Sequence, residues 1–490
     1  MSRYILVIDE GTTSTRAIAY DRDFLPAASA HEEVALSFPA NGWVEQDAED
    51  IWSATRRVSE AVIDRVGGVE AIAAIGIANQ RETTLVWDRV SGRAIHPAII
   101  WQDRRTGDLC DRMRADGVEA DVQSRTGLLL DPYFSATKIG WLLDTVDGAR
   151  AGAERGALAF GTVDAWLIWK LTGGRVHACD VTNASRTLLM ELQTGQWSPD
   201  LLTLFGVPRA LLPDIQASGA AFGVSDPEVF GKALPILSAL GDQQAALVGQ
   251  ACLRPGEAKI TLGTGAFLVA NTGGARVRSA HRLLATPAYE FDDGTAAFAL
   301  EGAIFNAGTV VKWLRDELNL IDNAADSERL AAALPDNGGV YFIPAFTGMG
   351  APHWRSDVRG QITGLSRGAR SAHIVRAGLE ACAYQTRDLL RAFAEDGAKV
   401  TNLRVDGGMA ANDWLMQFIA DICEVQVERP DNPEMTALGA AATAAFQLGW
   451  STPADWGRRS WTRRRFEPQM PGSARETLLA GWDRAVSALF

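Results

Sequence analysis

Cysteine and histidine are scarce in this chain of 490 residues, and neither is clustered. The five cysteines are isolated, odd in number and without a Cys-x-x-Cys pair, so the sequence offers no disulfide framework. The six histidines occur singly, which argues against a transition-metal site. We therefore expect a protein of a reducing compartment, the cytoplasm.

Long hydrophobic runs are also missing. A stretch such as "AIAAIGIA", residues 71–78, falls far short of the roughly eighteen apolar residues that cross a membrane. Asp9 and Glu10 interrupt the only apolar region near the start, so we expect neither a membrane span nor a signal peptide. The net charge of −13 argues against nucleic acid as a partner.

Two common nucleotide-binding motifs are absent. No Gly-x-x-x-x-Gly-Lys-[Ser/Thr] occurs, which excludes a P-loop. No complete Gly-x-Gly-x-x-Gly occurs either, because "GTGAFL" ends in Leu268, so there is no Rossmann fingerprint. Any phosphate site in this chain needs a different construction.

The sequence "ILVIDEGTTSTRAIAYD", residues 5–21, offers such a construction. It predicts a strand from Tyr4 to Ile8, a tight turn, and a strand from Arg16 to Tyr20. The turn residues Gly11 to Ser14 present backbone N–H groups and hydroxyls that can bind an anion. The preceding acids would repel phosphate, so the turn is either an ordinary hairpin tip or part of a site where at least one acid holds a cation.

A similar pattern occurs twice more. "AKITLGTGAFLVANTG", residues 258–273, predicts a second hairpin, and "LRVDGG" predicts a strand and glycine turn before a helix capped by Asn412. Each turn alone is more often a plain turn, but the three together favour a nucleotide site. We also expect a helix from Gly241 to Arg254, whose end is a plausible domain boundary. This boundary suggests two large domains, residues 1–250 and 251–490, although length alone allows three.

Many ordered segments resemble one family. These are "DEGTTSTRA", "GIANQRETTLVWD", "WQDRRT", "TGLLLDPYFSATK", "FGTVDAWLIWKLTGG", "TNASRT", "GDQQAALVGQ", "LGTGAF", "LEGAIFNAG", "PAFTGMGAPHW", "AYQTRD", "RVDGGMAAND" and "ERPDNPEMTALGAA". The chain thereby resembles the superfamily of sugar kinases, actin and heat-shock chaperones, and most closely the glycerol-phosphorylating branch of the FGGY carbohydrate kinases.

The resemblance implies an α/β fold of two actin-like (ribonuclease H-like) domains, with ATP and substrate in the cleft between them. It implies phosphorylation of glycerol to sn-glycerol 3-phosphate with ATP and Mg²⁺ in the cytoplasm, by a homodimer or homotetramer. It also implies roles for single residues. Asp242 is the general base, Asp9 and Asp242 lie at the metal, and the polyol contacts are Arg81, Glu82, Trp101, Tyr133, Asp242, Gln243 and Phe267. The nucleotide contacts are Thr12, Thr13, Ser14, Arg16, Thr264, Gly308, Lys312, Gly408 and Asn412.

Without the resemblance, several of these residues have simpler interpretations. Asp242 before "QQAALVGQ" is a suitable helix N-cap, and Arg81–Glu82 is a surface ion pair if both lie on a strand. Trp101 and Tyr133 would be core residues. Strand alternation also predicts that Asp9 faces the cleft and Glu10 faces away.

The chain departs from the usual family pattern at three positions: Glu10 in place of Gln, Asp103 in place of Cys, and Lys312 in place of Gln. The segment "AFGVSDPEVFGKALPILSAL", residues 221–240, lacks the Gly-Gly-x-Arg loop through which some members are regulated. It also lacks the histidine that others have phosphorylated, so we expect neither control. Two alternatives remain open. One is a kinase of the same family for another substrate such as xylulose or gluconate, and the other is an ATP-driven interaction protein.

Overall fold

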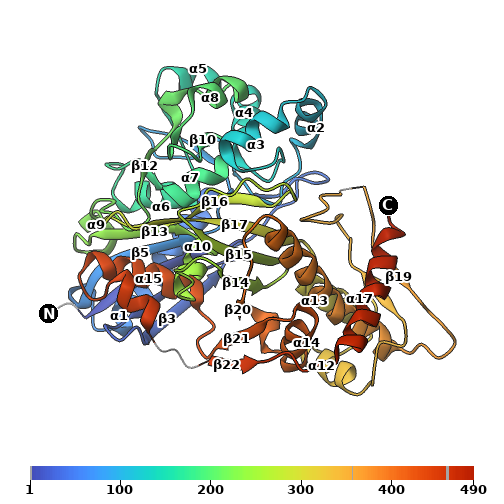
Figure 1. Ribbon diagram of the computed structural model, residues 1–490. Coiled ribbons are helices and arrows are strands. Elements are labelled where there is room, and N and C mark those ends of the chain that lie inside the picture. Colours follow the sequence, from blue (N-terminus) through green and yellow to red (C-terminus); the bar gives the residue numbers. More distant parts are fainter. Residues whose placement is uncertain (1–2, 356, 460–462) are drawn as a thin grey trace.

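The chain folds around two β-sheets (Figure 1). The computed structural model describes residues 3–355, 357–459 and 463–490. The first sheet has the order β13-β5-β1-β2-β3, in which β1 pairs antiparallel with β2 and parallel with β5. Its strands are β1 (Tyr4–Glu10), β2 (Ser14–Tyr20), β3 (Pro26–Glu33), β5 (Ile72–Asn79) and β13 (Ile236–Gly241).

The second sheet repeats this pattern. Its order is β16-β17-β15-β14-β20-β21-β22, in which β14 pairs antiparallel with β15 and parallel with β20. Its strands are β14 (Glu257–Leu262), β15 (Ala266–Gly273), β16 (Leu284–Glu290), β17 (Ala296–Ile304), β20 (Asn402–Asp406), β21 (Gln426–Pro430) and β22 (Arg463–Phe466). The two hairpins predicted from the sequence are thus confirmed, and they occupy equivalent places in the two sheets.

Helices cover the outer faces of both sheets. In the first half, α1 (Ala48–Arg65) packs against β2 and β3. In the second half, α13 (Ser371–Glu395) packs against α14 (Asp413–Cys423), which contacts β21. Asn412 caps α14, because its side chain accepts a hydrogen bond from the Leu415 N–H at 2.8 Å. The predicted cap and the predicted helix that follows it are confirmed.

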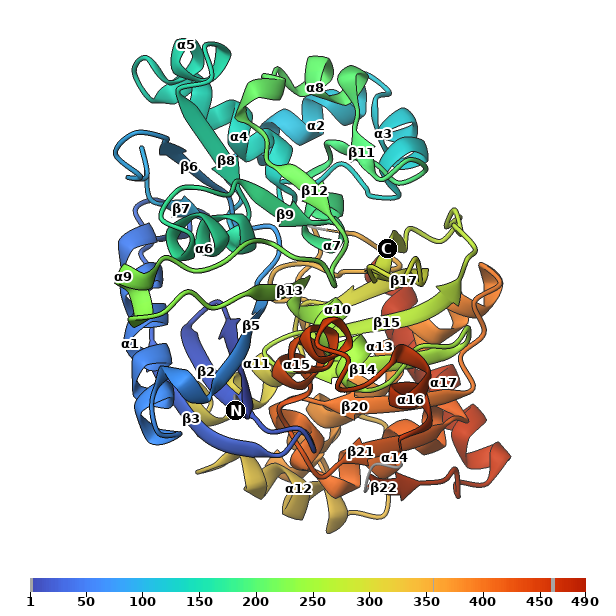
Figure 2. The same cartoon turned by 90° about the vertical axis from the view of Figure 1, so that its left-hand side faces the viewer.

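Two helices lie between the sheets, α10 (Asp242–Gly249) and α15 (Met435–Gln447) (Figure 2). They pack so closely that a Cβ atom on Gly249 or Gly439 would overlap with the backbone of the other helix. The helix α10 ends at Gly249, and Ala251 has a left-handed φ of 57°, so the predicted continuation to Arg254 is wrong. Because α15 also contacts β1, β5 and β13, a boundary near residue 250 stays a prediction.

A long segment between β5 and β13 forms the upper part of the molecule in Figures 1 and 2. Its side chains continue the hydrophobic core of the first sheet, with Trp87 and Trp166 fully buried. The strands are β4 (Glu45–Gln46), which precedes α1, and β6 (Leu85–Asp88), β7 (Ala98–Ile99), β8 (Leu158–Gly161), β9 (Ala178–Asp180), β10 (Met190–Glu191), β11 (Gln196–Trp197) and β12 (Asp214–Gln216). The helices are α2 (Gly107–Ala115), α3 (Glu119–Thr126), α4 (Ser135–Thr145), α5 (Ala149–Glu154), α6 (Val163–Leu171), α7 (Val181–Ala184), α8 (Pro199–Phe205) and α9 (Pro227–Phe230).

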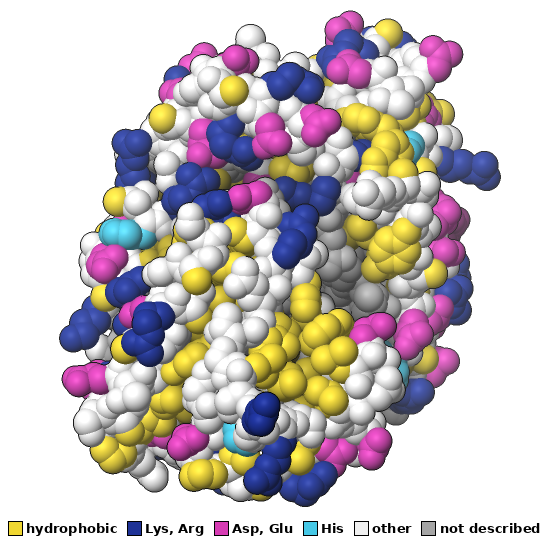
Figure 3. Space-filling model, turned by 90° about the vertical axis from the view of Figure 1, so that its right-hand side faces the viewer, with side chains coloured by type: hydrophobic (Ala, Val, Ile, Leu, Met, Phe, Trp, Pro, Cys, Tyr) yellow, Lys and Arg dark blue, Asp and Glu magenta, His cyan; other side chains and the backbone are white. Residues whose placement is uncertain are grey.

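The second half carries further short elements around its sheet. These are α11 (Gly308–Asp316), α12 (Ala324–Ala332), β18 (Tyr341–Ile343), β19 (Gln361–Thr363), α16 (Pro453–Arg458) and α17 (Gly472–Ser487). Acidic and basic side chains are interspersed over the face shown in Figure 3. No helix of the described chain is long and apolar enough to cross a bilayer, and all five cysteines are free thiols.

Candidate active site

The first phosphate hairpin is the turn between β1 and β2. The Gly11 N–H donates to the Ser14 carbonyl at 3.0 Å, which closes the turn. The Thr12 carbonyl accepts from Gln46 Nε2 at 3.1 Å, and the Thr12 hydroxyl accepts from Trp101 Nε1 at 2.9 Å. Thr13 is exposed and Ser14 is half-buried, so the turn presents polar groups while its base is fixed.

Asp9 and Glu10 face different surroundings, as strand alternation predicts. Burial is the main cause that raises the pKa of Asp9 to about 7, and the nearby Asp242 carboxylate adds to the shift. Glu10 is fully buried on the opposite face, where its Oε2 accepts from Gln80 Nε2 at 3.3 Å. Arg16, the predicted phosphate contact, forms an ion pair with Glu434 directly before α15. A cation near Asp9 and Asp242 would relieve the repulsion between two carboxylates.

A cavity with a volume of about 160 Å³ lies next to this hairpin. All seven predicted polyol contacts line it, together with residues of both hairpins. The lining residues are Thr12, Gln80, Arg81, Glu82, Trp101, Tyr133, Asp242, Gln243, Thr261, Gly263, Thr264, Gly265 and Phe267. The Trp101 ring lies with its centroid 5.6 Å from that of Tyr133 and 6.1 Å from that of Phe267, which forms an apolar wall beside the charged groups.

Asp242 is placed where β13 meets α10. It is the first residue of the helix, and Gly241 occupies the N-cap, so the interpretation of Asp242 as the N-cap is wrong. Its Oδ1 accepts from the Gln243 N–H at 2.7 Å and lies 3.4 Å from Arg81 Nε. Burial raises the pKa of Asp242 above that of an ordinary aspartate, although Arg81 opposes the shift. A carboxylate in this position can accept a proton from a hydroxyl in the cavity.

Gln243 is held by a lysine from the other half of the chain. Lys259, on β14 and fully buried, donates to Gln243 Oε1 and, at 2.9 Å, to the Thr261 hydroxyl. Since Oε1 is engaged, the Gln243 Nε2 group is the one turned toward Asp242 Oδ2, at 3.2 Å. The side chain therefore presents a donor to the cavity.

The second hairpin, Gly263 to Gly265, is joined to the start of α11. The Gly308 N–H donates to the Gly263 carbonyl at 2.9 Å, and the Ala307 N–H to the Thr264 carbonyl at 3.0 Å. A Cβ atom on Gly308 would lie 2.5 Å from the Gly263 carbonyl oxygen, so this approach requires glycine. The structure thereby brings the predicted nucleotide residues Thr264 and Gly308 together.

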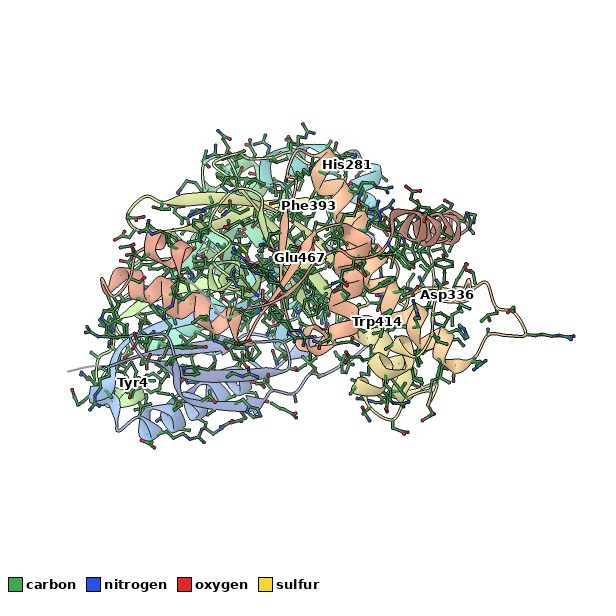
Figure 4. The ribbon with its side chains drawn as sticks, turned by 60° about the horizontal axis from the view of Figure 1, so that its bottom comes forward. Tyr4, His281, Asp336, Phe393, Trp414 and Glu467 are labelled. Carbon is green, nitrogen blue, oxygen red and sulfur yellow. The ribbon has the colours of Figure 1, made fainter. Side chains whose placement is uncertain are left out.

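The third glycine turn lies between β20 and α14. Gly407 has a left-handed φ of 88°, and Gly408 begins a 3-10 turn (Gly408–Ala411) that leads to Asn412. Trp414, labelled in Figure 4, marks the first turn of α14, in the half of the molecule opposite to Tyr4 on β1. Lys312 is exposed on α11. Three other predicted nucleotide contacts are exposed as well, namely Thr13, Thr264 and Gly408.

Comparison with known proteins identifies this arrangement. The models of the N-terminal and C-terminal domains of the FGGY family of carbohydrate kinases match residues 4–249 and 258–448. The chain belongs to this family. The glycerol kinase of Rhodospirillum centenum is 56% identical over 98% of this chain and 97% of its own length, and glycerol kinase 1 of Pseudomonas aeruginosa is 54% identical over 99% of both.

Solved structures of FGGY kinases agree with this result. The crystal structure of Plasmodium falciparum glycerol kinase with ADP has a TM-score of 0.94 and 34% identity, and the match covers 100% of this chain and 99% of that one. A gluconate kinase from Lactobacillus acidophilus has a TM-score of 0.90 at 21% identity over 99% of this chain and 98% of that one, a likeness of fold alone. The predicted two-domain, actin-like α/β fold is confirmed.

The FGGY cavity contains two charged residues that strand alternation places at the surface. Arg81 and Glu82 are only 3% and 1% exposed, so the surface ion pair expected from spacing alone is wrong. The reason is that β5 ends at Asn79, which removes both residues from the alternation of the strand. Their burial depends on side chains that are distant in sequence.

Those side chains are Glu301 on β17 and Arg186, which follows α7. Glu301 Oε1 accepts from Arg81 Nη2 and from Arg186 Nη2, each at 2.9 Å, and Oε2 pairs with Arg81 Nη1. Arg186 Nε also donates to Glu82 Oε1 at 2.7 Å. Although burial opposes ionisation, Arg186 and Arg81 lower the pKa of Glu301 to about 2. Glu301 and Arg186 lie within "LEGAIFNAG" and "TNASRT", segments that gave the family but no role for either residue.

We expect Glu301→Gln to lower kcat/KM for the polyol by roughly 10²-fold, because Arg81 would lose the carboxylate that fixes its position. Steady-state kinetics with the polyol and ATP varied separately measure this effect. Glu380→Gln is the matched control, since Glu380 is an equally buried acid that accepts from Arg376 Nε at 2.7 Å inside α13. If both variants lose the same stability and the same kcat/KM, Glu301 has no specific role at the cavity.

The unusual Asp103 has its own partner. Its Oδ2 accepts from the Val44 N–H at 2.6 Å and from Arg105 Nη2 at 2.8 Å, and both Asp103 and Arg105 side chains are fully buried. Arg105 lies between the rings of Trp43 and Trp141, with its guanidinium carbon 3.9 Å and 4.6 Å from their centroids. Asp103 therefore neutralises a buried arginine behind the loop that carries Trp101.

We expect Asp103→Ala to lower the free energy of unfolding by about 3 kcal/mol, because it strips a buried arginine of one partner. Denaturant-induced unfolding measures this change. Arg104→Ala, which breaks the partly exposed ion pair between Arg104 and Asp131, should cost no more than about 1 kcal/mol. Equal losses for the two variants would contradict the assignment.

Proposed function

We propose that this FGGY kinase transfers the γ-phosphoryl group of ATP to glycerol and releases sn-glycerol 3-phosphate. The observation that carries the proposal is the small cavity whose wall combines Arg81, Glu82 and Asp242 with Thr12 and Thr264 of the two hairpins. A hydroxyl bound there lies beside a buried carboxylate and beside the turns that suit phosphates. The named glycerol kinase relatives, above 50% identity over nearly the whole chain, support the same substrate.

The cavity suits a small polyol. Its volume of about 160 Å³ is large enough to hold a triol. Arg81 and Gln243 offer donors, Glu82 and Asp242 offer acceptors, and Trp101 and Phe267 cover the carbon chain. A polar site of this kind rejects ligands that leave a buried group unpaired, at about 1–3 kcal/mol per group.

Asp242 would accept the proton of the attacking hydroxyl, and Arg81 and Gln243 would hold the carboxylate and the polyol in line. The phosphates would be positioned from the first half by Thr12, Thr13, Ser14 and Arg16, and from the second half by Thr264. The rest of the nucleotide would be bordered by Gly308, Gly408, Asn412 and Lys312. Closure of the two halves would exclude water from the transferred group.

Mg²⁺ fits this site. Asp9 and Asp242 supply carboxylate oxygens, the ligands that Mg²⁺ prefers. Burial is the main cause of the raised pKa of Asp9, and the Asp242 carboxylate adds to it, so the two acids interact across the site. When bound with ATP, the ion would neutralise charge on the phosphates.

We also propose that the protein is cytoplasmic and that it assembles as a homodimer or homotetramer. Analytical ultracentrifugation would check the oligomeric state.

The test is an ADP-release assay of the purified chain with ATP and Mg²⁺ across glycerol, dihydroxyacetone, glyceraldehyde, xylulose and gluconate. We expect the highest kcat/KM with glycerol. A higher value with xylulose or gluconate would make the enzyme a different FGGY kinase. ATP turnover that is independent of any polyol would favour the ATP-driven interaction protein instead.

A further inference from the structure

A buried carboxylate outside the cavity organises the backbone beneath it. Asp180 ends β9 and precedes α7, and it is fully buried together with Thr182 and Asn183. Its Oδ2 accepts from the Thr182 N–H at 3.0 Å, the Thr182 hydroxyl at 2.7 Å and the Ser218 hydroxyl at 2.8 Å. Its Oδ1 accepts from the Asn183 N–H at 2.8 Å and Asn183 Nδ2 at 2.7 Å.

These contacts fix the direction of the Thr182 hydroxyl. Because its proton is donated to Asp180, its lone pairs are free to accept from another group. That group is the Gly241 N–H, at 2.9 Å. Gly241 is the last residue of β13, the N-cap of α10 and the residue directly before Asp242.

The same group reaches the neighbouring strand through Asn183. Asn183 and Asn79 exchange two side-chain hydrogen bonds of 2.9 Å and 3.1 Å, and Asn79 Nδ2 donates to the Gln80 carbonyl at 2.8 Å. Gly241 also packs against Arg81, since a Cβ atom at Gly241 would lie 2.7 Å from Arg81 Cγ and Cδ. Asp180 thus holds the ends of β5 and β13, from which Arg81 and Asp242 enter the cavity.

We propose that Thr182 is a positioning residue for phosphoryl transfer: oriented by Asp180, it fixes the Gly241 backbone and thereby the Asp242 carboxylate. The inference rests on the proposed function, in which Asp242 acts on the bound hydroxyl. Without the Thr182 hydroxyl, the Gly241 N–H loses its acceptor in a buried place, and the strand end must shift to satisfy it. Displacing a reacting group by about 1 Å can cost roughly 10²-fold in rate.

The test compares Thr182→Val, which keeps the shape and removes the hydroxyl, with Thr182→Ser, which keeps the hydroxyl. Thr386→Val is the matched control, because Thr386 is equally buried in α13 and its hydroxyl donates to the Cys382 carbonyl at 2.7 Å. We measure kcat, both KM values and the unfolding temperature of each variant. If Thr182→Val does not fold, Thr182→Ala against Thr182→Ser makes the same comparison.

We expect Thr182→Val to lower kcat by roughly 10- to 100-fold with little change in KM for ATP, and Thr182→Ser to restore most of it. Thr386→Val should lower only the unfolding temperature. A near-normal kcat for Thr182→Val, or an equal loss in both valine variants, would overturn the inference. The kcat of each variant is divided by that of the wild-type enzyme. Both are measured with whichever polyol or sugar the wild-type enzyme phosphorylates fastest. Failure with glycerol itself therefore counts against the proposed function, while the ratio still decides the role of Thr182.

Discussion

Replacing Asp242 by asparagine is expected to lower kcat by about 10²- to 10⁴-fold, the usual contribution of a general base. Asparagine has the same shape and retains an oxygen for the Gln243 N–H, so the variant should fold. It cannot accept the proton of the attacking hydroxyl. The loss should appear mainly in kcat. Because Asp242 is also a proposed ligand of the Mg²⁺ bound with ATP, a smaller rise in KM for ATP should accompany it.

Steady-state and single-turnover kinetics measure this loss, and single turnover separates chemistry from product release. Asp388→Asn is a suitable control. Asp388 is a buried aspartate of α13 that accepts from Trp482 Nε1 at 2.9 Å, far along the chain from the cavity residues. It should affect stability alone. An Asp242→Asn enzyme with near-normal kcat would remove Asp242 from the role of base.

Local sequence signals predicted the parts of this molecule that depend on neighbours in the chain. The two hairpins, the glycine turn after β20 and the Asn412 cap each depend on a few consecutive residues, and all are present. The strand ends were less accurate, because β1 extends to Glu10 and β2 begins at Ser14. The roles of single residues in the cavity came from family resemblance, since Trp101 or Tyr133 alone would be taken for a core residue.

Contacts between distant segments explain what the sequence did not predict. Glu301 meets Arg81 across 220 positions of the chain and Arg186 across 115. No local pattern signals such a pairing, so the burial of Arg81 was missed with it. The early end of α10 was missed for a different reason: Ala251 adopts a left-handed φ of 57°, and an alanine gives no local signal for that conformation.

The second large effect is expected at Asp9, and it should not be shared by its neighbour. Asp9→Asn removes a negative charge from the place where Asp242 and the first phosphate hairpin meet, so it should weaken the hold on Mg²⁺ with ATP. We expect kcat to fall by roughly 10²-fold, in line with the loss of one pre-placed electrostatic contact. Activity measured over a range of Mg²⁺ concentrations should show a higher requirement for the ion.

Glu10→Gln is the control that the fold itself provides. Burial raises the pKa of Glu10 well above its usual value, which favours the neutral form that glutamine resembles in shape and charge. Its Oε2 accepts a hydrogen bond from Gln80 Nε2, and the amide oxygen of glutamine can accept the same bond. Gln80 should therefore keep its place in the cavity wall, and kcat should stay near normal. Equal losses at both positions would mean that the charge of the β1 end as a whole, and not the face to which Asp9 points, determines activity. Since the two acids are adjacent on one strand, only the alternation of side chains separates their roles.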